Sequence, residues 1–349
     1  MNRLFASSLL AVTLLASLPA GAAEVTLHET GSTLLYPLFQ LWSVDYAAAN
    51  PGTGIATAAT GSGAGIAEAV AGHVQIGASD AYMSDEEAER DRHILNIPVA
   101  ISAQTVNYNL PGLGGTKLKL DGPALAGIYS GTIRMWDSPE IAGMNPGLHL
   151  PHQAIIPIRR ADPSGDTFIF TQFLDFAVPS WDEAVGFGTK VPWPAVSGAR
   201  SANGNEGMVK ALAATPYSVG YVGVSFEDTV ARAGLGTAML RSQAGQFLLP
   251  TAETVNAAAS ELDSRTPADE RLSLVFAPGD NAYPLINYEY VVVSTRQPDP
   301  ATAAAIRNFL LWSISPEGGN APQYLTAVHF IALPDFIRAL SENQIKRIQ

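Results

Sequence analysis

Apolar segments too short for helices alternate with helix-like segments along almost the whole chain, and this alternation is the feature that most constrains the fold. In the first helix-like segment, residues 33–49, large apolar side chains recur at every fourth position. The expected strands are 25–27, 55–60, 74–77, 97–110, 154–159, 219–224 and 284–294, and the expected helices are 33–49, 63–71, 84–90, 167–176, 205–214, 226–233 and 300–314. Strands separated by helices predict an α/β fold with doubly wound layers around a mostly parallel sheet.

The length of 349 residues exceeds what a single hydrophobic core usually organises, so we expect two lobes. The two long extended segments, near residues 105 and 288, suit a chain that crosses between lobes and later returns. We therefore predict one lobe from residues 24–104 and 283–349, and a second lobe from residues 105–282.

Residues 1–23 are predicted to be a removable export signal. They contain a single charged side chain, Arg3, followed by an apolar run over residues 9–18. They end in a series of small residues, the last of which is Ala23. That run is too short to span a bilayer, and no later stretch reaches about 18 uninterrupted apolar residues. The chain has no cysteine for lipid attachment. The expectation is a monomeric periplasmic protein that is not embedded in the membrane.

The charge balance and the missing motifs exclude several functions. A formal net charge of −12 argues against nucleic acid or an anionic membrane as partner, because both require clustered Lys and Arg. The sequence contains no phosphate-cradling P-loop, no nucleophile elbow and no zinc-protease motif. His149 and His152 form the only close histidine pair, and we expect them to face solvent rather than hold a metal.

Three expected helix starts share an abundance of hydrogen-bond donors. They lie at residues 31–34, 60–65 and 159–167, and each combines glycine with Ser or Thr. The first turn of a helix leaves about four N–H groups unpaired and has about half a positive charge, so it attracts anions. One such segment alone indicates ordinary helix capping. Three of them, the last with paired arginines, favour a shared anion site.

The same segments carry a resemblance to a known family, the phosphate-binding proteins of Pst-type ABC importers. The matching strings are GSTL at 31–34, GSGAG at 61–65, GASD at 77–80, RRADPSGDTF at 159–168, NGNEGM at 203–208 and YPLINYEY at 283–290. Together they extend over essentially the whole chain after the leader. The resemblance implies a two-lobed periplasmic binding protein, each lobe a mixed, mostly parallel sheet flanked by helices, joined by a two-strand hinge.

The resemblance also implies a set of ligand-binding residues. The phosphate contacts would come from Thr33, Leu34, Ser62, Gly63, Asp80, Arg160, Ser164, Gly165 and Asp166. Asp80 would be the acceptor carboxylate and Arg160 the cation, with Asp162 orienting the guanidinium from behind. Arg159 is expected to point away and to make surface ion pairs, because neighbours on a strand alternate faces.

Four positions depart from the family pattern. Leu34 stands where many members have Phe, Gly63 where many have Ser, and Pro163 where Gly is frequent. The Gly63 change leaves open whether Ser62 or Gly63 contacts the ligand through a side chain or the backbone. Asp166 stands where many members have Thr, and it adds a second carboxylate near the anion.

The function implied by the resemblance is binding of inorganic phosphate in the periplasm and its delivery to the membrane permease of an ABC importer. No enzymatic activity, cofactor or metal is expected. Two alternatives stay open: a receptor of the same fold for sulfate or molybdate, and an exported phosphoester hydrolase. The carboxylates favour phosphate, because a fully ionised oxyanion has no proton to give them.

Overall fold

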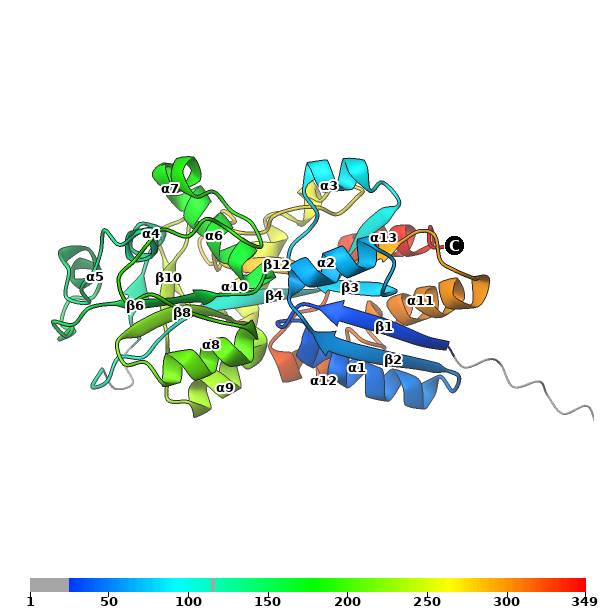
Figure 1. Ribbon diagram of the computed structural model, residues 1–349, viewed down its shortest axis with the longest axis horizontal. Coiled ribbons are helices and arrows are strands. Elements are labelled where there is room, and N and C mark those ends of the chain that lie inside the picture. Colours follow the sequence, from blue (N-terminus) through cyan, green and yellow to red (C-terminus); the bar gives the residue numbers. More distant parts are fainter. Residues whose placement is uncertain (1–24, 114–116) are drawn as a thin grey trace, which may run out of the picture.

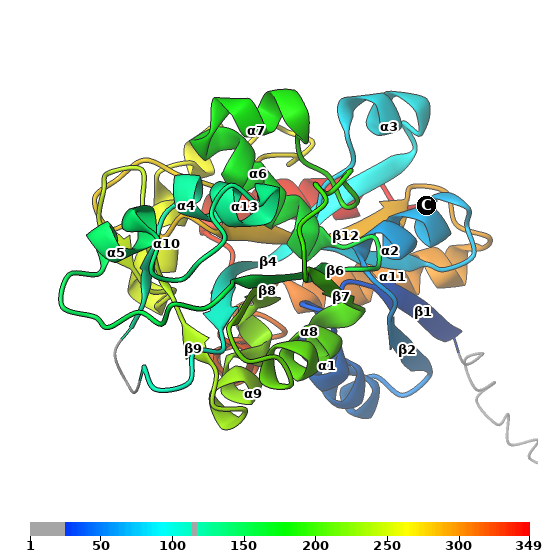
Figure 2. The same ribbon diagram turned by 60° about the vertical axis from the view of Figure 1, so that its left-hand side comes forward.

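The computed structural model describes residues 25–113 and 117–349, so the predicted export signal lies outside the described residues. The described chain forms two lobes (Figures 1 and 2). Strands β1–β3 and helices α1, α2, α11 and α13 lie in one lobe, and β6–β8 and helices α4 to α9 lie in the other. This confirms the two-lobed α/β fold.

Within the described residues, a nine-stranded sheet runs through both lobes. Eight strands follow the order β2-β1-β3-β12-β4-β8-β6-β7, and β9 also pairs with β4. These strands are β1 (Val25–Gly31), β2 (Thr53–Ala59), β3 (Ile76–Ser79), β4 (Ile94–Tyr108), β6 (Ile156–Arg160), β7 (Arg200–Ala202), β8 (Ser218–Gly223), β9 (Gly236–Thr237) and β12 (Ile286–Ser294). A smaller sheet contains β5 (Lys119–Leu120), β10 (Met239–Arg241) and β11 (Phe247–Leu248).

The large sheet is mixed, with its parallel pairs toward the outside. Strand β1 pairs parallel with β2 and β3 in one lobe, and β6 pairs parallel with β7 and β8 in the other. Strand β12 runs antiparallel to both β3 and β4, and β4 runs antiparallel to β8. Parallel strand ends therefore point toward the junction of the lobes from both sides.

Helices cover both faces of the sheet. They are α1 (Tyr36–Ala49), α2 (Ser62–Val70), α3 (Asp85–Arg90), α4 (Gly122–Ser130), α5 (Pro139–Met144), α6 (Gly165–Ala177), α7 (Pro179–Ala184), α8 (Gly204–Ala213), α9 (Glu227–Arg232), α10 (Ala252–Ser260), α11 (Pro300–Ser313), α12 (Pro322–Leu325) and α13 (Asp335–Ile345), with short 3₁₀ turns at Val224–Phe226, Asp263–Arg265 and Thr326–Val328. Helix α2 packs on β3 and β12, and α8 packs on β6 and β8. In the described part of the chain, each helix is too short or too polar to cross a membrane.

Strands β4 and β12 form the connection between the lobes. Strand β4 pairs with β12 as far as Ala103, opposite Ile286, and from Gln104 onward it pairs with β8. Its partner thus changes where we predicted the lobe boundary, although the full division into 24–104 plus 283–349 and 105–282 stays a prediction. A β-bulge interrupts the β4–β12 pairing between Glu289 and Tyr290.

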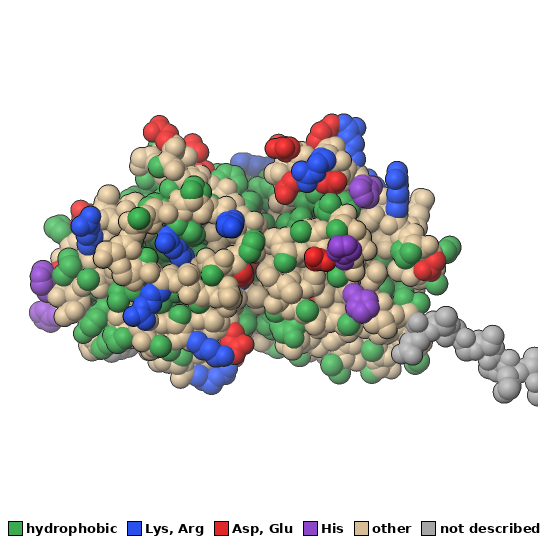
Figure 3. All heavy atoms as spheres, viewed as in Figure 1, with side chains coloured by type: hydrophobic (Ala, Val, Ile, Leu, Met, Phe, Trp, Pro, Cys, Tyr) green, Lys and Arg blue, Asp and Glu red, His purple; other side chains and the backbone are tan. Residues whose placement is uncertain are grey.

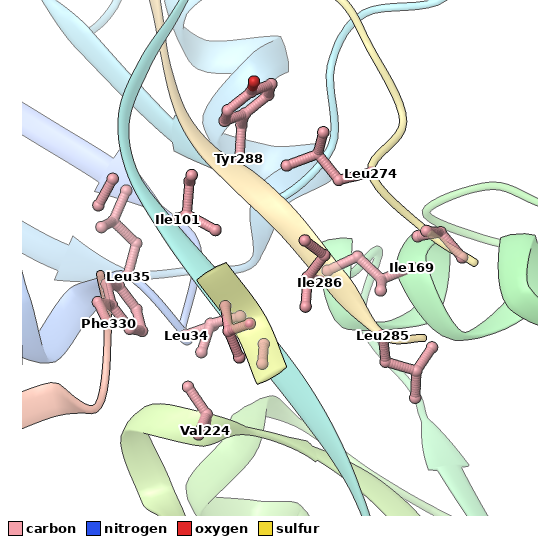
Figure 4. Close-up of a cluster of buried hydrophobic side chains, with 14 of the residues drawn as sticks. Leu34, Leu35, Ile101, Ile169, Val224, Leu274, Leu285, Ile286, Tyr288 and Phe330 are labelled. Atoms are coloured by element: carbon pink, nitrogen blue, oxygen red, sulfur yellow. The ribbon is translucent and has the colours of Figure 1, made fainter. Parts of the chain in front are cut away.

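The hydrophobic core continues across this connection. Figure 4 shows Leu34, Ile101 and Ile286 around β4 and β12, with Val224 on the side of the second lobe, and all four are buried. Leu34 lies so close to the end of β8 that a Cβ atom on Gly223 would be 2.3 Å from its side chain. The two lobes therefore share one apolar cluster beneath their junction.

Candidate functional site

Four helices begin at the junction of the lobes, α1 and α2 from one side and α6 and α8 from the other. The Gly63 N–H at the start of α2 donates to the Pro163 carbonyl just before α6, at 3.2 Å. The Asn205 N–H at the start of α8 donates to Thr33 Oγ1 before α1, also at 3.2 Å. Helix N-termini carry partial positive charge, so this convergence favours an anion.

Local sequence explains why the helices begin here. Ser32 Oγ accepts hydrogen bonds from the Leu34 and Leu35 N–H groups at 3.1 and 2.9 Å, so regular helix α1 starts only at Tyr36. Ser164 is the N-cap of α6, and its hydroxyl accepts from the Thr167 N–H at 3.4 Å. Both are typical uses of serine at a helix start.

Asp80 follows the end of β3 and is the central carboxylate of the first lobe. It is 2% exposed and accepts hydrogen bonds from Ser32 Oγ and, at 3.2 Å, from Ser62 Oγ. Burial, followed by the nearby charge of Asp166, raises the pKa of Asp80, while the hydrogen bonds from Ser32 and Glu289 and the charge of Arg160 lower it.

Arg160, at the end of β6, is the central cation of the second lobe. Its side chain is fully buried and contacts two carboxylates. The Nε and Nη2 atoms donate to the two oxygens of Asp162, the first at 2.8 Å, and Nη1 donates to Asp166 Oδ2. Burial alone would raise the pKa of Asp162, but the hydrogen bonds and charge of Arg160 lower it. Asp162 thus holds the guanidinium in place as an ionised partner.

Asp166 lies in the first turn of α6 and is fully buried. Besides Arg160, its carboxylate accepts from Asn205 Nδ2 at 2.8 Å and from Gln104 Nε2 at 3.1 Å. Burial raises its pKa, while Arg160, Gln104 and Asn205 oppose that effect. A carboxylate is thus held by the kinds of donor that recognise anions.

Gly165 allows the start of α6 to touch the first lobe. A Cβ atom at this position would lie 2.5 Å from both Asp80 Oδ2 and Ser62 Oγ. Any larger residue would therefore separate Asp80 from the N-terminus of α6.

A groove leads from this buried cluster to the surface. It has a volume of about 750 Å³ and lies between the starts of α1 and α8, where Thr33, Tyr36, Asp162, Asn205 and Phe226 line it. On the face seen in Figure 3, acidic and basic side chains lie together on α3. Arg160 does not line the groove, but Asp162, its ion-pair partner, does.

The chain matches a family model described as the PBP superfamily domain over residues 18–317. It is 32% identical to the phosphate-binding protein PstS of Methanocaldococcus jannaschii, with 94% of this chain and 87% of that protein covered. It is 33% identical to the phosphate-binding protein PstS of Xylella fastidiosa, with 93% and 84% covered. The chain belongs to the PstS family.

Solved structures agree with the fold of PstS proteins. A high-affinity periplasmic phosphate-binding protein solved with bound phosphate has a TM-score of 0.72 and 21% identity, covering 90% of this chain and 92% of that one. A phosphate-binding protein from Stenotrophomonas maltophilia has a TM-score of 0.68 and 20% identity, covering 92% and 94%. At these identities the likeness concerns the fold alone.

The structure brings all the predicted site residues together. Thr33, Leu34, Ser62, Gly63 and Asp80 come from the first lobe, and Arg160, Asp162, Ser164, Gly165 and Asp166 come from the second. Two expected backbone donors are engaged within the protein: the Leu34 N–H with Ser32 and the Gly63 N–H with Pro163. Their roles as ligand contacts, like the other roles in this set, stay predictions.

The prediction that Arg159 makes surface ion pairs is wrong. Its guanidinium lies over the Trp193 ring, 5.6 Å from the centroid, and donates to the Pro194 carbonyl at 3.1 Å. Among the described residues it has no ion-pair partner. The side chain points away from Arg160 because the two alternate on β6.

Sequence reasoning missed three polar residues of the cluster. Asn205 links both lobes, since its Nδ2 donates to Thr33 Oγ1 at 3.0 Å and to Asp166. Gln104 joins Asp166 from the hinge strand, and Ser32 joins Asp80. The string NGNEGM, noted for its family resemblance, was the available signal for Asn205. Within the described residues, no group of three or more His, Asp or Glu side chains is placed to hold a metal ion.

Proposed function

We propose that this protein binds inorganic phosphate between its lobes. The observation that carries the proposal is that Asp80 and Arg160 come from opposite lobes, are 2% and 4% exposed, and lie near enough for the charge of Arg160 to act on Asp80. A buried guanidinium and several helix N-termini suit a compact anion. A buried carboxylate acceptor suits an anion that still has a proton, as phosphate does near neutral pH.

The transport role belongs to the same proposal. The protein would collect phosphate in the periplasm as a monomer and deliver it to the permease subunits of an ABC importer, acting as a receptor without enzymatic activity and without a cofactor. The names of the PstS relatives and the leader-like residues 1–23 support this. Closure of the lobes would remove water from the ligand and strengthen its charge-assisted hydrogen bonds.

Calorimetry with three ligands tests the proposal. Phosphate, sulfate and a phosphate monoester are titrated separately into the protein at pH 7. We expect tight binding of phosphate, with sulfate and the ester bound far more weakly. Tighter binding of sulfate would instead indicate a sulfate-type receptor, and turnover of the ester to free phosphate would indicate a hydrolase.

A further inference from the structure

Glu289 is a buried carboxyl group beside the site that the phosphate-binding residues do not include. It lies on β12 and is 0% exposed. Its Oε1 accepts from Ser102 Oγ at 2.5 Å and from Asn287 Nδ2 at 3.0 Å. Its Oε2 is buried and receives a hydrogen bond from no donor of the described residues. Within the described part of the chain, this carboxyl therefore has two neutral hydrogen-bond donors and no ion-pair partner.

The backbone around Glu289 is irregular at the same place. The bulge between Glu289 and Tyr290 leaves Val99 of β4 without a partner on β12. The Val99 carbonyl accepts instead from Asn320 Nδ2 at 2.7 Å. Bulges change the direction of side chains and occur beside functional sites.

The partner of Glu289 is Asp80. Asn287 Nδ2 joins the two residues, because it donates to Glu289 Oε1 at 3.0 Å and to the Asp80 backbone carbonyl at 3.3 Å. The two carboxyl groups are near enough to shift each other's pKa, and Asp80 raises that of Glu289. Two carboxyl groups can form a hydrogen bond only if one of them has a proton. A hydrogen bond between Asp80 and Glu289 therefore requires a proton on one of the two carboxyl groups.

The surroundings decide which carboxyl has the proton. Asp80 accepts from two serine hydroxyls and lies near the positive charge of Arg160, although the negative charge of Asp166 has the larger effect on its pKa. Glu289 has only Ser102 and Asn287 as donors and faces the negative charge of Asp80. Burial, followed by Asp80, raises the pKa of Glu289 well above its ordinary value. The proton consequently resides on Glu289.

We propose that Glu289 is a positioning residue that stays neutral and donates its Oε2 proton to Asp80, which keeps Asp80 ionised as the acceptor for the proton of phosphate. This rests on the proposed phosphate function and extends it to selectivity. If Asp80 were protonated, it would donate hydrogen bonds and would accept sulfate as readily as phosphate. Glu289 thereby maintains discrimination between the two anions as the pH falls.

The test compares wild type with Glu289→Gln and Glu289→Met, each titrated with phosphate and sulfate at pH 5.5 and 7.5. Gln can still donate to Asp80 and accept from Ser102. We therefore expect the affinities of Glu289→Gln for both anions to stay within about threefold of wild type, a smaller change than the loss of one hydrogen bond to a charged group would cause. Met removes the donor. We expect its phosphate-over-sulfate preference to fall about tenfold at pH 5.5, the size of one such hydrogen bond, and less at pH 7.5.

A merely structural role would lower stability and both affinities without changing the preference for phosphate at pH 5.5, and that result would overturn the proposal. Infrared difference spectra of wild type against Glu289→Gln read the proton directly and independently of any ligand. We expect a protonated-carboxyl difference band at pH 7 that belongs to Glu289, because the bands of Glu29 and Glu270 are common to both proteins and cancel. Its absence in a protein that binds phosphate would overturn the inference. Its presence in a protein that does not bind phosphate would refute the proposed function and leave the proton on Glu289.

Discussion

At the scale of single residues, Arg160 and Arg159 form a natural comparison. They are neighbours on β6, yet Arg160 is buried between Asp162 and Asp166, whereas Arg159 stacks on Trp193. Loss of one member of a desolvated charge pair costs about 2–5 kcal/mol of binding free energy, which corresponds to roughly 30- to several-thousand-fold in affinity. Calorimetry should therefore show such a loss of phosphate affinity in Arg160→Ala and a change below threefold in Arg159→Ala.

Folding must be checked in the same variants, because Arg160→Ala also leaves two carboxylates without their cation. Breaking a buried ion pair typically lowers the free energy of unfolding by about 3–5 kcal/mol. Arg160→Lys keeps the charge but cannot reach both Asp162 and Asp166 in the same geometry, so it should lie between wild type and Arg160→Ala. Equal loss of affinity in Arg159→Ala and Arg160→Ala would contradict the assigned roles.

Asp80 and Asp166 make a second residue-scale prediction, on selectivity. A carboxylate repels a fully ionised oxyanion in a dry site but accepts a hydrogen bond from a protonated one. Asp80→Asn should weaken phosphate binding by only ~1–2 kcal/mol, because the amide still forms a hydrogen bond. Sulfate binding should rise most in the Asp80→Asn/Asp166→Asn double variant. The measurement is a sulfate titration at pH 6 and 8 of wild type, both single variants and the double variant. If the double variant still rejected sulfate as completely as wild type, the two carboxylates would not determine selectivity.

The residues of the cluster were predictable to different degrees. Asp80, Arg160 and Ser164 lie in strings that the family pattern makes conspicuous. Asn205 and Glu289 were not predicted, because their importance arises from contacts with residues 39 and more than 180 positions away in the sequence. A single Asn or Glu in a helix start or strand has no local pattern that reveals such a partner.

At the scale of secondary-structure elements, the start of α6 is the piece most sensitive to added volume. Gly165→Ala would place a Cβ atom 2.5 Å from Asp80 Oδ2, so the lobes could no longer approach each other at this point. We expect phosphate affinity to fall by at least about tenfold, equivalent to ~1.4 kcal/mol, with little change in the melting temperature of the ligand-free protein. Calorimetry and small-angle scattering with phosphate test this.

Gly143→Ala is the matched control for that variant. Gly143 also lies in a helix, α5, but a Cβ atom there would meet nothing within 4 Å. Wild-type affinity and wild-type compaction by phosphate are expected for this variant. If Gly165→Ala behaved in the same way, the proposed contact between α6 and Asp80 would not matter for binding.

The elements themselves were predicted where periodicity was strong and missed where it was weak. The seven predicted strands and the seven predicted helices appear within a few residues of the expected bounds, whereas the short strands β7 and β9 of the large sheet were not predicted. The first helix starts three residues later than predicted, because Ser32 takes the N–H groups of the preceding turn. Helices α4 and α10 were missed although Asp121 and Thr251 cap them, since capping residues alone do not distinguish a helix from a turn.

At the scale of the whole molecule, two buried carboxyl groups make stability depend on pH. Burial raises the pKa values of Glu29 and Glu270 to about 8, from 4.5. Between about pH 4 and 8 the folded protein therefore binds more protons than the unfolded chain, and stability falls as the pH rises through this window. The melting temperature of the ligand-free protein should accordingly be higher at pH 5.5 than at pH 8.

Glu29→Gln should flatten that dependence, because the amide cannot ionise and its oxygen can still accept from the Thr57 hydroxyl, as Glu29 does. Glu86→Gln, on the exposed face of α3, is the control and should leave the slope unchanged. Thermal unfolding followed at half-unit steps from pH 5.5 to 8 provides the comparison. A wild-type melting temperature that rises toward pH 8 would contradict the prediction.

The position of β12 in the sheet also sets an order of events in time. Residues 286–294 lie between β3 and β4, so neither strand has its full set of partners until the last quarter of the chain is available. In a chain that is synthesised from its N-terminus, β3 and β4 would each have one unpaired edge until β12, about 200 residues later, becomes available. Pairing across such separations is slow. The sheet is therefore expected to be completed late, and β3 and β4 lack the strand between them for most of the synthesis of the chain.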